Sequence, residues 1–214
     1  MIIYLHIKRI NKEVPMPTRT FLRLPKEKRL RILRAAKKEF SRVPLDKAVI
    51  ANIVKEAEIP RGSFYQYFEN VDDLFIYLMQ YMYGIDKRKF AKYLEQTDND
   101  VYEALKLKFS HTIDKLANSE NRQFRINIMT TIFNDDSRYE NLARKIVEPD
   151  LEIDLTYFPD GFQKSKYSQN LLNIIKMIGK SCLEKYLAKI VTKDEIKENY
   201  NSYIDLVKLG FEKI

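Results

Sequence analysis

The sequence predicts an all-α protein with an N-terminal three-helix head, a larger C-terminal helical body and about nine helices in all. The first observation behind this class is that apolar residues recur three and four positions apart through most of the 214 residues, the period of amphipathic helices. The second is the stretch 53–68, which indicates two short helices joined by a tight turn at 58–60. Residues 151–155 alternate as a strand would, but the segment is too short to predict a sheet.

The composition excludes several classes of protein. With 45% hydrophobic and 32% charged residues, the chain is expected to be soluble and to bury a substantial core as one large or two small domains. No apolar run is long enough for a transmembrane helix, and residues 1–7 are apolar before they are basic, the wrong order for a secretory signal. Its single cysteine, Cys182, excludes an internal disulfide and is consistent with the reducing cytoplasm, where we expect this protein.

Positive charge is concentrated in the first third of the chain. Residues 1–71 hold 16 Lys and Arg against 7 Asp and Glu, a net charge of +9, whereas residues 72–214 hold 22 against 23, a net charge of −1. The excess therefore coincides with the helix-turn-helix pattern, and a polyanion is the expected partner. The alternative is an ordinary solvated basic face.

The head is predicted over residues 25–71. Its first helix starts at Pro25, which fits a first helical turn, and runs to about Ser41, before the helix-ending proline at 44. Asp46 is the expected cap of the second helix, whose inward residues are Ile50, Ile53 and Val54.

The third helix is amphipathic in a particular way. Phe64 and Phe68 lie four residues apart and are expected to be buried on one face. The outer faces then carry hydrogen-bond donors, as a recognition helix requires: Arg61, Ser63, Tyr65, Gln66 and Tyr67.

The run 61–68, preceded by Ala57-Glu58-Ile59-Pro60 and followed by Asp72-Asp73-Leu74, resembles the signature of the TetR/AcrR family of transcriptional regulators. The resemblance covers about 26–78. It implies a homodimer that represses transcription from a palindromic, double-stranded DNA operator and is released by a small-molecule effector bound in the C-terminal body. The alternative is a helical partner-binding or small-molecule-carrying protein that kept the fold without specific operator binding.

Roles on DNA follow from side-chain chemistry. Arg61 and Gln66 are the long donors suited to guanine and adenine edges, while Gly62 lets the backbone approach a phosphate closely. Hydroxyl donors to phosphates, and a lysine near the start of the second helix, complete the predicted contact set of Lys47, Arg61, Gly62, Ser63, Tyr65, Gln66 and Tyr67. Alternatively, some of these tyrosines shield the small core of the head, Tyr67 first among them.

The chain departs from the family pattern at four positions. Glu58 stands where relatives have glycine, so a left-handed backbone is expected there at a cost of about 1–2 kcal/mol. Val71 replaces a phosphate-binding lysine, and Val49 and Ala51 replace a hydroxyl cap and a base-reading side chain. Base recognition is therefore expected to rest on Arg61 and Gln66.

Residues 1–24 show no helical period and are predicted to be an arm. Met16 opens a stretch that resembles the beginning of family members, so residues 1–15 are expected to be an upstream start or non-native. The alternative is that Arg19 and Arg23 belong to a basic arm that contacts phosphates or the minor groove.

The body is predicted over residues 72–214. A long helix capped by Asn70 is apolar all round in 74–83, so we expect it to be buried on every side and to touch both head and body. Further helices follow around 101–116, 124–132 and 139–147, then an irregular stretch at 148–166. Two long helices close the chain, and the second begins with a capping box at 192–195.

The body supplies two predicted sites and no catalytic one. An apolar or aromatic effector is expected to contact Tyr81, Tyr93, Phe109, Ile113, Phe124, Ile128 and Phe133, although such residues are more often plain core. The dimer face is expected to include Leu171, Ile175, Ile178, Tyr203, Val207 and Phe211. The two histidines lie far apart and the five glycines are isolated, so no enzyme activity, cofactor or metal is expected.

Overall fold

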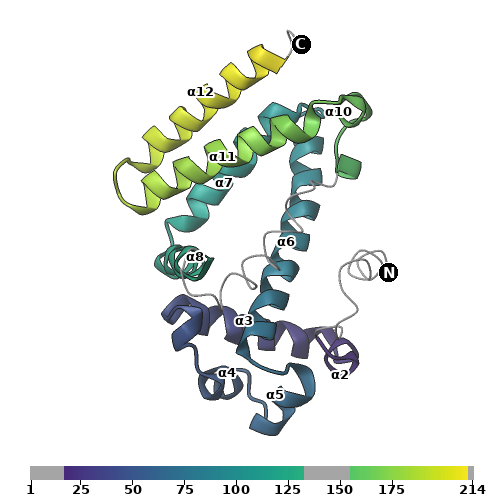
Figure 1. Cartoon of the computed structure of the whole chain (residues 1–214), viewed down its shortest axis with the longest axis vertical. Helices are drawn as coiled ribbons and strands as arrows, with labels where there is room; N and C mark the ends of the chain where they lie inside the picture. The colour runs from purple at the N-terminus through teal and green to yellow at the C-terminus, as the bar shows by residue number, and fades with distance from the viewer. Residues whose placement is uncertain (1–16, 133–154, 212–214) are drawn as a thin grey trace.

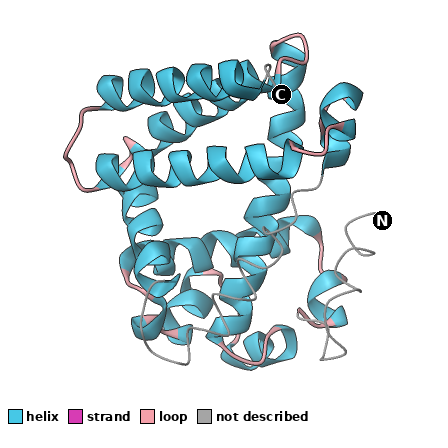
Figure 2. Cartoon of the chain, turned by 45° about the horizontal axis from the view of Figure 1, so that its top comes forward, coloured by secondary structure: helices cyan, strands magenta, loops and turns pink. Residues whose placement is uncertain are grey.

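The computed structural model of this chain describes residues 17–132 and 155–211, and every regular element in these ranges is helical (Figure 2). The predicted all-α class is confirmed. Figure 1 shows the N-terminal head, in purple and blue, at one end of the molecule and the C-terminal helices, in green and yellow, at the other. None of the helices in the described ranges has the length and apolar character needed to cross a lipid bilayer.

The head begins one helix earlier than predicted. In the described part of the chain it consists of α2 (Arg19–Leu22), α3 (Lys26–Arg42), the 3-10 turn η1 (Leu45–Lys47), α4 (Ile50–Glu56) and α5 (Arg61–Tyr67). Pro25 precedes α3, and the extended backbone of Val43 before Pro44 ends it, as the proline predicts. Asp46 was wrongly expected to cap α4: it lies within η1, and the N-cap of α4 is Val49, whose side chain accepts no hydrogen bond.

The segment predicted as an arm enters the head core. Thr18 caps α2 and donates its backbone N–H to the Tyr67 carbonyl over 3.1 Å. Phe21 is fully buried, with its ring centroid 4.8 Å from that of Phe68 and 5.3 Å from that of Tyr77. Four helical residues are too few to produce a period in the sequence, which explains why this helix was missed.

The turn between α4 and α5 adopts the predicted left-handed conformation. Glu58 has φ 51°, and the Ile59 N–H donates to the Val54 carbonyl over 3.0 Å while the Glu58 N–H donates to Lys55 over 3.2 Å. This bonding pattern is the Schellman motif, which satisfies carbonyls that the end of a helix leaves unpaired. The usual glycine is absent, so a side chain occupies a backbone region that costs about 1 kcal/mol or more.

The long helix α6 (Val71–Gln96) joins head and body. Asn70 caps it as predicted, accepting the Asp73 N–H over 3.0 Å. Near its start it buries Leu74, Phe75 and Leu78 in the head core, and near its end it buries Phe90 and Leu94 in the body core. The expectation of burial on every side was wrong: residues 79–85 are half-exposed, and Met79, Tyr81 and Met82 pack against the head core without being buried in it.

The described part of the body contains six further elements. They are α7 (Val101–Leu116), α8 (Ser119–Ile132), η3 (Leu155–Tyr157), α10 (Asp160–Lys164), α11 (Ser168–Leu187) and α12 (Lys193–Phe211). The predicted capping box is confirmed, since the Thr192 N–H donates to Glu195 Oε2 over 2.8 Å and the Glu195 N–H donates to Thr192 Oγ1 over 3.3 Å. The helix predicted at 139–147 lies outside the described residues.

Ion pairs fix how α12 lies along α7. Asp114, near the end of α7, accepts from Lys193 over 2.6 Å and from Lys197 over 2.7 Å at the start of α12. At the opposite ends, Asp100 accepts from Lys208 over 3.0 Å. Hydrogen bonds from Lys193 and Lys197 lower the pKa of Asp114 to about 2. Because the pairs occur at both ends, the two helices are antiparallel and in a defined register.

A polar joint connects the body helix α8 to the head helix α3. Asn127 is buried and donates its amide to the Phe40 carbonyl over 2.8 Å and to the Ser41 carbonyl over 3.1 Å. Thr131 accepts the Leu45 N–H over 3.4 Å. The body thus supplies caps for the last turn of α3, whose carbonyls would otherwise lack partners.

Candidate nucleic-acid interface

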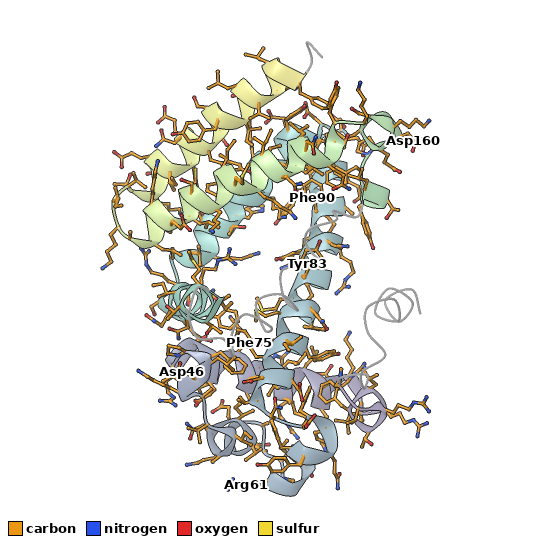
Figure 3. All side chains as sticks on the ribbon, viewed as in Figure 1. Asp46, Arg61, Phe75, Tyr83, Phe90 and Asp160 are labelled. Carbon is orange, nitrogen blue, oxygen red and sulfur yellow. The ribbon has the colours of Figure 1, made fainter. Side chains whose placement is uncertain are left out.

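The outer face of α5 is exposed as predicted. Phe64 and Phe68 are fully buried, which turns Arg61, Tyr65 and Gln66 toward solvent. Figure 3 places Arg61 at the tip of the head, at the opposite end of the molecule from Asp160 in the body. Long donors project from one exposed helix face of the head, the geometry needed to enter a DNA groove.

Tyr67 does not share this outer face. Only 4% of the residue is exposed, and its ring lies edge-on to Phe21 with centroids 5.9 Å apart. The reason is helical spacing, because residues 64, 67 and 68 fall on one side of a helix. The structure therefore adopts the alternative in which Tyr67 shields the core. The prediction that the Tyr67 ring lies on the outer face was wrong.

Gly62 has no internal reason to be glycine. A Cβ built on this residue meets nothing within 4 Å, and its backbone does not adopt positive φ. It follows Pro60 and Arg61 at the start of α5, where the first N–H groups of a helix have no helical partner. The missing side chain therefore leaves open surface outside the protein, where a phosphate backbone can approach.

The other predicted or alternative basic contacts lie in η1 and beside α2. Lys47 is exposed in η1, next to the start of α4. Arg19 and Arg23 are exposed on or beside α2, which is tied to α5 because the Thr18 hydroxyl donates to the Gln66 carbonyl over 2.7 Å. The two arginines thus lie on a segment that packs against α5, which favours the basic-arm alternative for this part of the chain.

A buried carboxylate in the head was missed from the sequence. Glu39 Oε1 accepts the Val49 N–H over 2.9 Å and an Arg42 guanidinium N–H over 2.7 Å, while Oε2 accepts a second N–H from Arg42 over 2.9 Å. The Asn52 amide donates to Oε1 over 3.1 Å. Burial raises the pKa of Glu39, but these hydrogen bonds outweigh burial and hold the pKa below its usual value. Helical spacing could have predicted this burial, because residue 39 lies on the same face of the helix as Ile32 and Ala36.

The fold and this face define the class of helix-turn-helix transcriptional regulators. Residues 32–78 match the family described as bacterial regulatory proteins, tetR family. The match confirms the resemblance over the head and the start of α6. No curated protein sequence matches it.

Several solved structures of regulators share this fold. The TetR transcriptional regulator from Rhodococcus sp. RHA1 gives a TM-score of 0.55 at 13% identity, over 85% of this chain and 95% of that one. The fatty acid degradation regulator FadR from Bacillus halodurans gives a TM-score of 0.60 at 17% identity, over 81% of this chain and 96% of that one. FadR from Bacillus subtilis in complex with stearoyl-CoA gives a TM-score of 0.50 at 18% identity, over 83% of this chain and 96% of that one. At these identities the likeness shows the fold.

The residues predicted to line an effector pocket are divided between the two cores. Phe124 and Ile128 belong to the head core, with Tyr81 packed against it. Phe109 and Ile113 belong to the body core, where Phe109 stacks on Tyr200 with ring centroids 3.8 Å apart. Tyr93 packs against the body core, and Phe133 lies outside the described residues.

The predicted dimer residues also separate into two groups. Leu171 and Ile175 are buried in the body core and were wrongly placed on the outer face, because the apolar stripe of α11 is wide enough to serve both sides. Half-buried Phe211 packs against that core. The others lie on or beside a groove of about 350 Å³ between α11 and α12, lined by Ile178, Ser181, Cys182, Lys185, Tyr203, Leu206 and Val207.

That groove lies within an exposed apolar face. Met177 is 64% exposed and Leu206 is 66% exposed, and both are large apolar side chains on the two closing helices. Ile174 and Leu209 are exposed on the same helices. We call this surface, formed by Ile174, Met177, Ile178, Tyr203, Leu206 and Val207, the α11–α12 face.

Proposed function

We propose that this protein is a homodimeric repressor that binds a palindromic operator through α5 and leaves it when a small apolar or aromatic effector binds the body. The observation that carries the proposal is the exposed row of donors on α5, backed by Phe64 and Phe68, in the most basic part of the chain. A small-molecule carrier has no need of such a face.

The contacts divide into two kinds. Arg61 and Gln66 read base edges, where a good bidentate pair is worth about 1–3 kcal/mol of discrimination. Ser63 and Tyr65 donate to phosphates and set position rather than sequence, as does the backbone at Gly62. Lys47 adds a phosphate contact near the start of α4.

The α11–α12 face supports the dimer. Exposed apolar patches with polar surroundings are typical of protein interfaces, and two protruding helices from each copy form a four-helix packing. A two-fold dimer presents its two heads to successive half-sites about one helical turn of DNA apart, so the operator is an inverted repeat.

Effector control rests on the elements that head and body share. The helix α6 contributes to both cores, while Asn127 holds α8 to the end of α3 and Thr131 holds it to η1. An effector that favours an arrangement of α6 and α8 different from the DNA-bound one must therefore move the head. Because coupling between two sites is reciprocal, the effector then lowers DNA affinity and DNA lowers effector affinity. Binding of stearoyl-CoA by the Bacillus subtilis FadR supports an effector with a long apolar part.

The test is selection of DNA from a random duplex pool by the full-length protein at physiological salt. We expect enrichment of one inverted repeat, with half-sites about 10 base pairs apart or a multiple of that spacing. The binding measurement is then repeated with long-chain acyl-CoA and with aromatic molecules. We expect one of these two classes of small molecule to release the enriched DNA. No enriched sequence would overturn the proposal.

A further inference from the structure

The second helix of the helix-turn-helix has no cap of its own. Val49 occupies its N-cap position, and a valine side chain cannot accept a hydrogen bond from the first turn. The acceptor comes instead from the preceding helix, because Glu39 Oε1 receives the Val49 N–H over 2.9 Å. The same carboxylate also receives the side chain of Asn52, one turn further along α4.

Resting on the proposed function, we infer that Glu39 is the positioning residue of the DNA-reading unit: it fixes the start of α4 against α3 and thereby sets the angle at which α5 meets DNA. Glu39 itself does not touch DNA, since only 5% of it is exposed.

The chemistry of the cluster explains why this link is rigid. A carboxylate withdrawn from water must be matched by donors, and Glu39 has the two parallel N–H groups of Arg42 in addition to those of Val49 and Asn52. The positive end of the α4 dipole favours the same negative charge. These interactions hold only while Val49 and Asn52 stay where they are, so a displacement of α4 breaks several of them together.

The displacement would reach the recognition helix directly. The left-handed turn at Glu58 closes the end of α4 with two hydrogen bonds, and α5 begins three residues later at Arg61. A displacement of α4 against α3 is therefore passed to the start of α5, while the end of α5 stays held by Thr18 and Phe21. Base contacts need accurate geometry, whereas contacts to phosphates tolerate small changes of angle. A small error in this angle therefore weakens base contacts more than phosphate contacts.

A matched pair of variants tests the inference. Glu39→Gln and Glu56→Gln make the same chemical change and remove the same charge from the head, but Glu56 is an exposed residue of α4 paired with Lys38 over 2.8 Å. If negative charge near DNA were all that mattered, both variants would bind DNA more tightly. We expect Glu39→Gln to lower affinity for the selected operator about tenfold, as the loss of charged hydrogen bonds implies, and to leave affinity for unrelated DNA unchanged.

Rescue separates positioning from general stability. Adding Val49→Ser to Glu39→Gln gives α4 an N-cap of its own, and we expect operator affinity to return to within about threefold of the wild type. All proteins are compared at a temperature where circular dichroism shows them fully folded. If Glu39→Gln does not fold, a second pair of variants replaces the cationic partners instead. Arg42→Gln removes the partner of Glu39, and Lys38→Gln removes the partner of Glu56. We expect selective loss of operator binding for Arg42→Gln alone.

Equal operator affinities for Glu39→Gln and Glu56→Gln would overturn the inference, as would equal losses on operator and unrelated DNA. Either result leaves the proposed function intact, because the wild type would still select an operator. Failure of the wild type to select any sequence would instead remove the proposed function.

Discussion

The ring of Phe21 packs against the ring of Phe68 with centroids 4.8 Å apart, and this contact fastens the first described helix, α2, to the end of α5. Both side chains are fully buried. The segment before α3 is thus part of the platform that holds α5, and its basic residues Arg19 and Arg23 are held beside the candidate DNA-binding face.

Phe21→Ala should destabilise the protein strongly. Removing a fully buried phenylalanine costs about 3–5 kcal/mol through lost burial and the cavity left behind. Urea denaturation followed by circular dichroism measures the loss. Leu22→Ala, in the same short helix but at a half-buried position, should lower the free energy of unfolding clearly less. Equal losses for the two variants would contradict the role given to Phe21 in the head core.

Glu58→Gly should stabilise the protein by about 1 kcal/mol, because glycine adopts the left-handed backbone at this position without the penalty that a side chain carries. The exposed ion pair with Arg31, at 3.5 Å, is weak and its loss matters little. Glu58→Ala is the control, since it removes the same ion pair but keeps the strain. A gain for alanine as large as that for glycine would show that the backbone is not the cause.

Gly62→Ala should separate stability from DNA binding. The added methyl group meets no atom within 4 Å and alanine favours helix, so thermal stability should stay equal or rise slightly. DNA affinity should fall, because the methyl group would stand between the backbone and the phosphate that we propose approaches it. Gly161→Ala is a close match, as it also follows a proline cap at the second position of a helix with open space around it. Unchanged DNA binding by Gly62→Ala would remove the proposed role of this glycine.

Leu206→Glu should convert the proposed dimer to monomers. Leu206 is 66% exposed in the single chain, so the charge is harmless to folding but costly once buried between two copies. Sedimentation velocity at micromolar concentration reports the change. Tyr157→Glu, at another exposed apolar position outside the α11–α12 face, should remain dimeric. A dimer that survives Leu206→Glu would mean that the copies associate elsewhere.

Local signals in the sequence were sufficient for most of the fold. Helical period, the Asn70 cap, the Thr192 capping box and the turn at Glu58 depend on residues close together in the chain, and the structure confirms each of them. The outward placement of Arg61 and Gln66 followed from the same reasoning.

Features that depend on contacts between distant residues were not predictable in this way. Phe21 lies 47 positions from Phe68, its partner in the head core. The Asn127 bonds to α3 join residues 86 and 87 positions apart. On α11, a wide apolar stripe cannot by itself say which edge faces the core, so Leu171 and Ile175 were assigned to the wrong side. Sequence alone likewise could not divide the predicted effector residues between two cores.

The most direct test of the central claim is a competition measurement with Gln66→Ala and Arg61→Ala, using the selected operator and an unrelated duplex of equal length. If the outer face of α5 reads the bases, each variant loses about 1–3 kcal/mol of operator affinity, and with it most of its preference for the operator over the unrelated duplex. In sedimentation, each variant should show the same oligomeric state as the wild type. Variants that retain the wild-type preference would contradict the assignment of α5 as the helix that reads DNA.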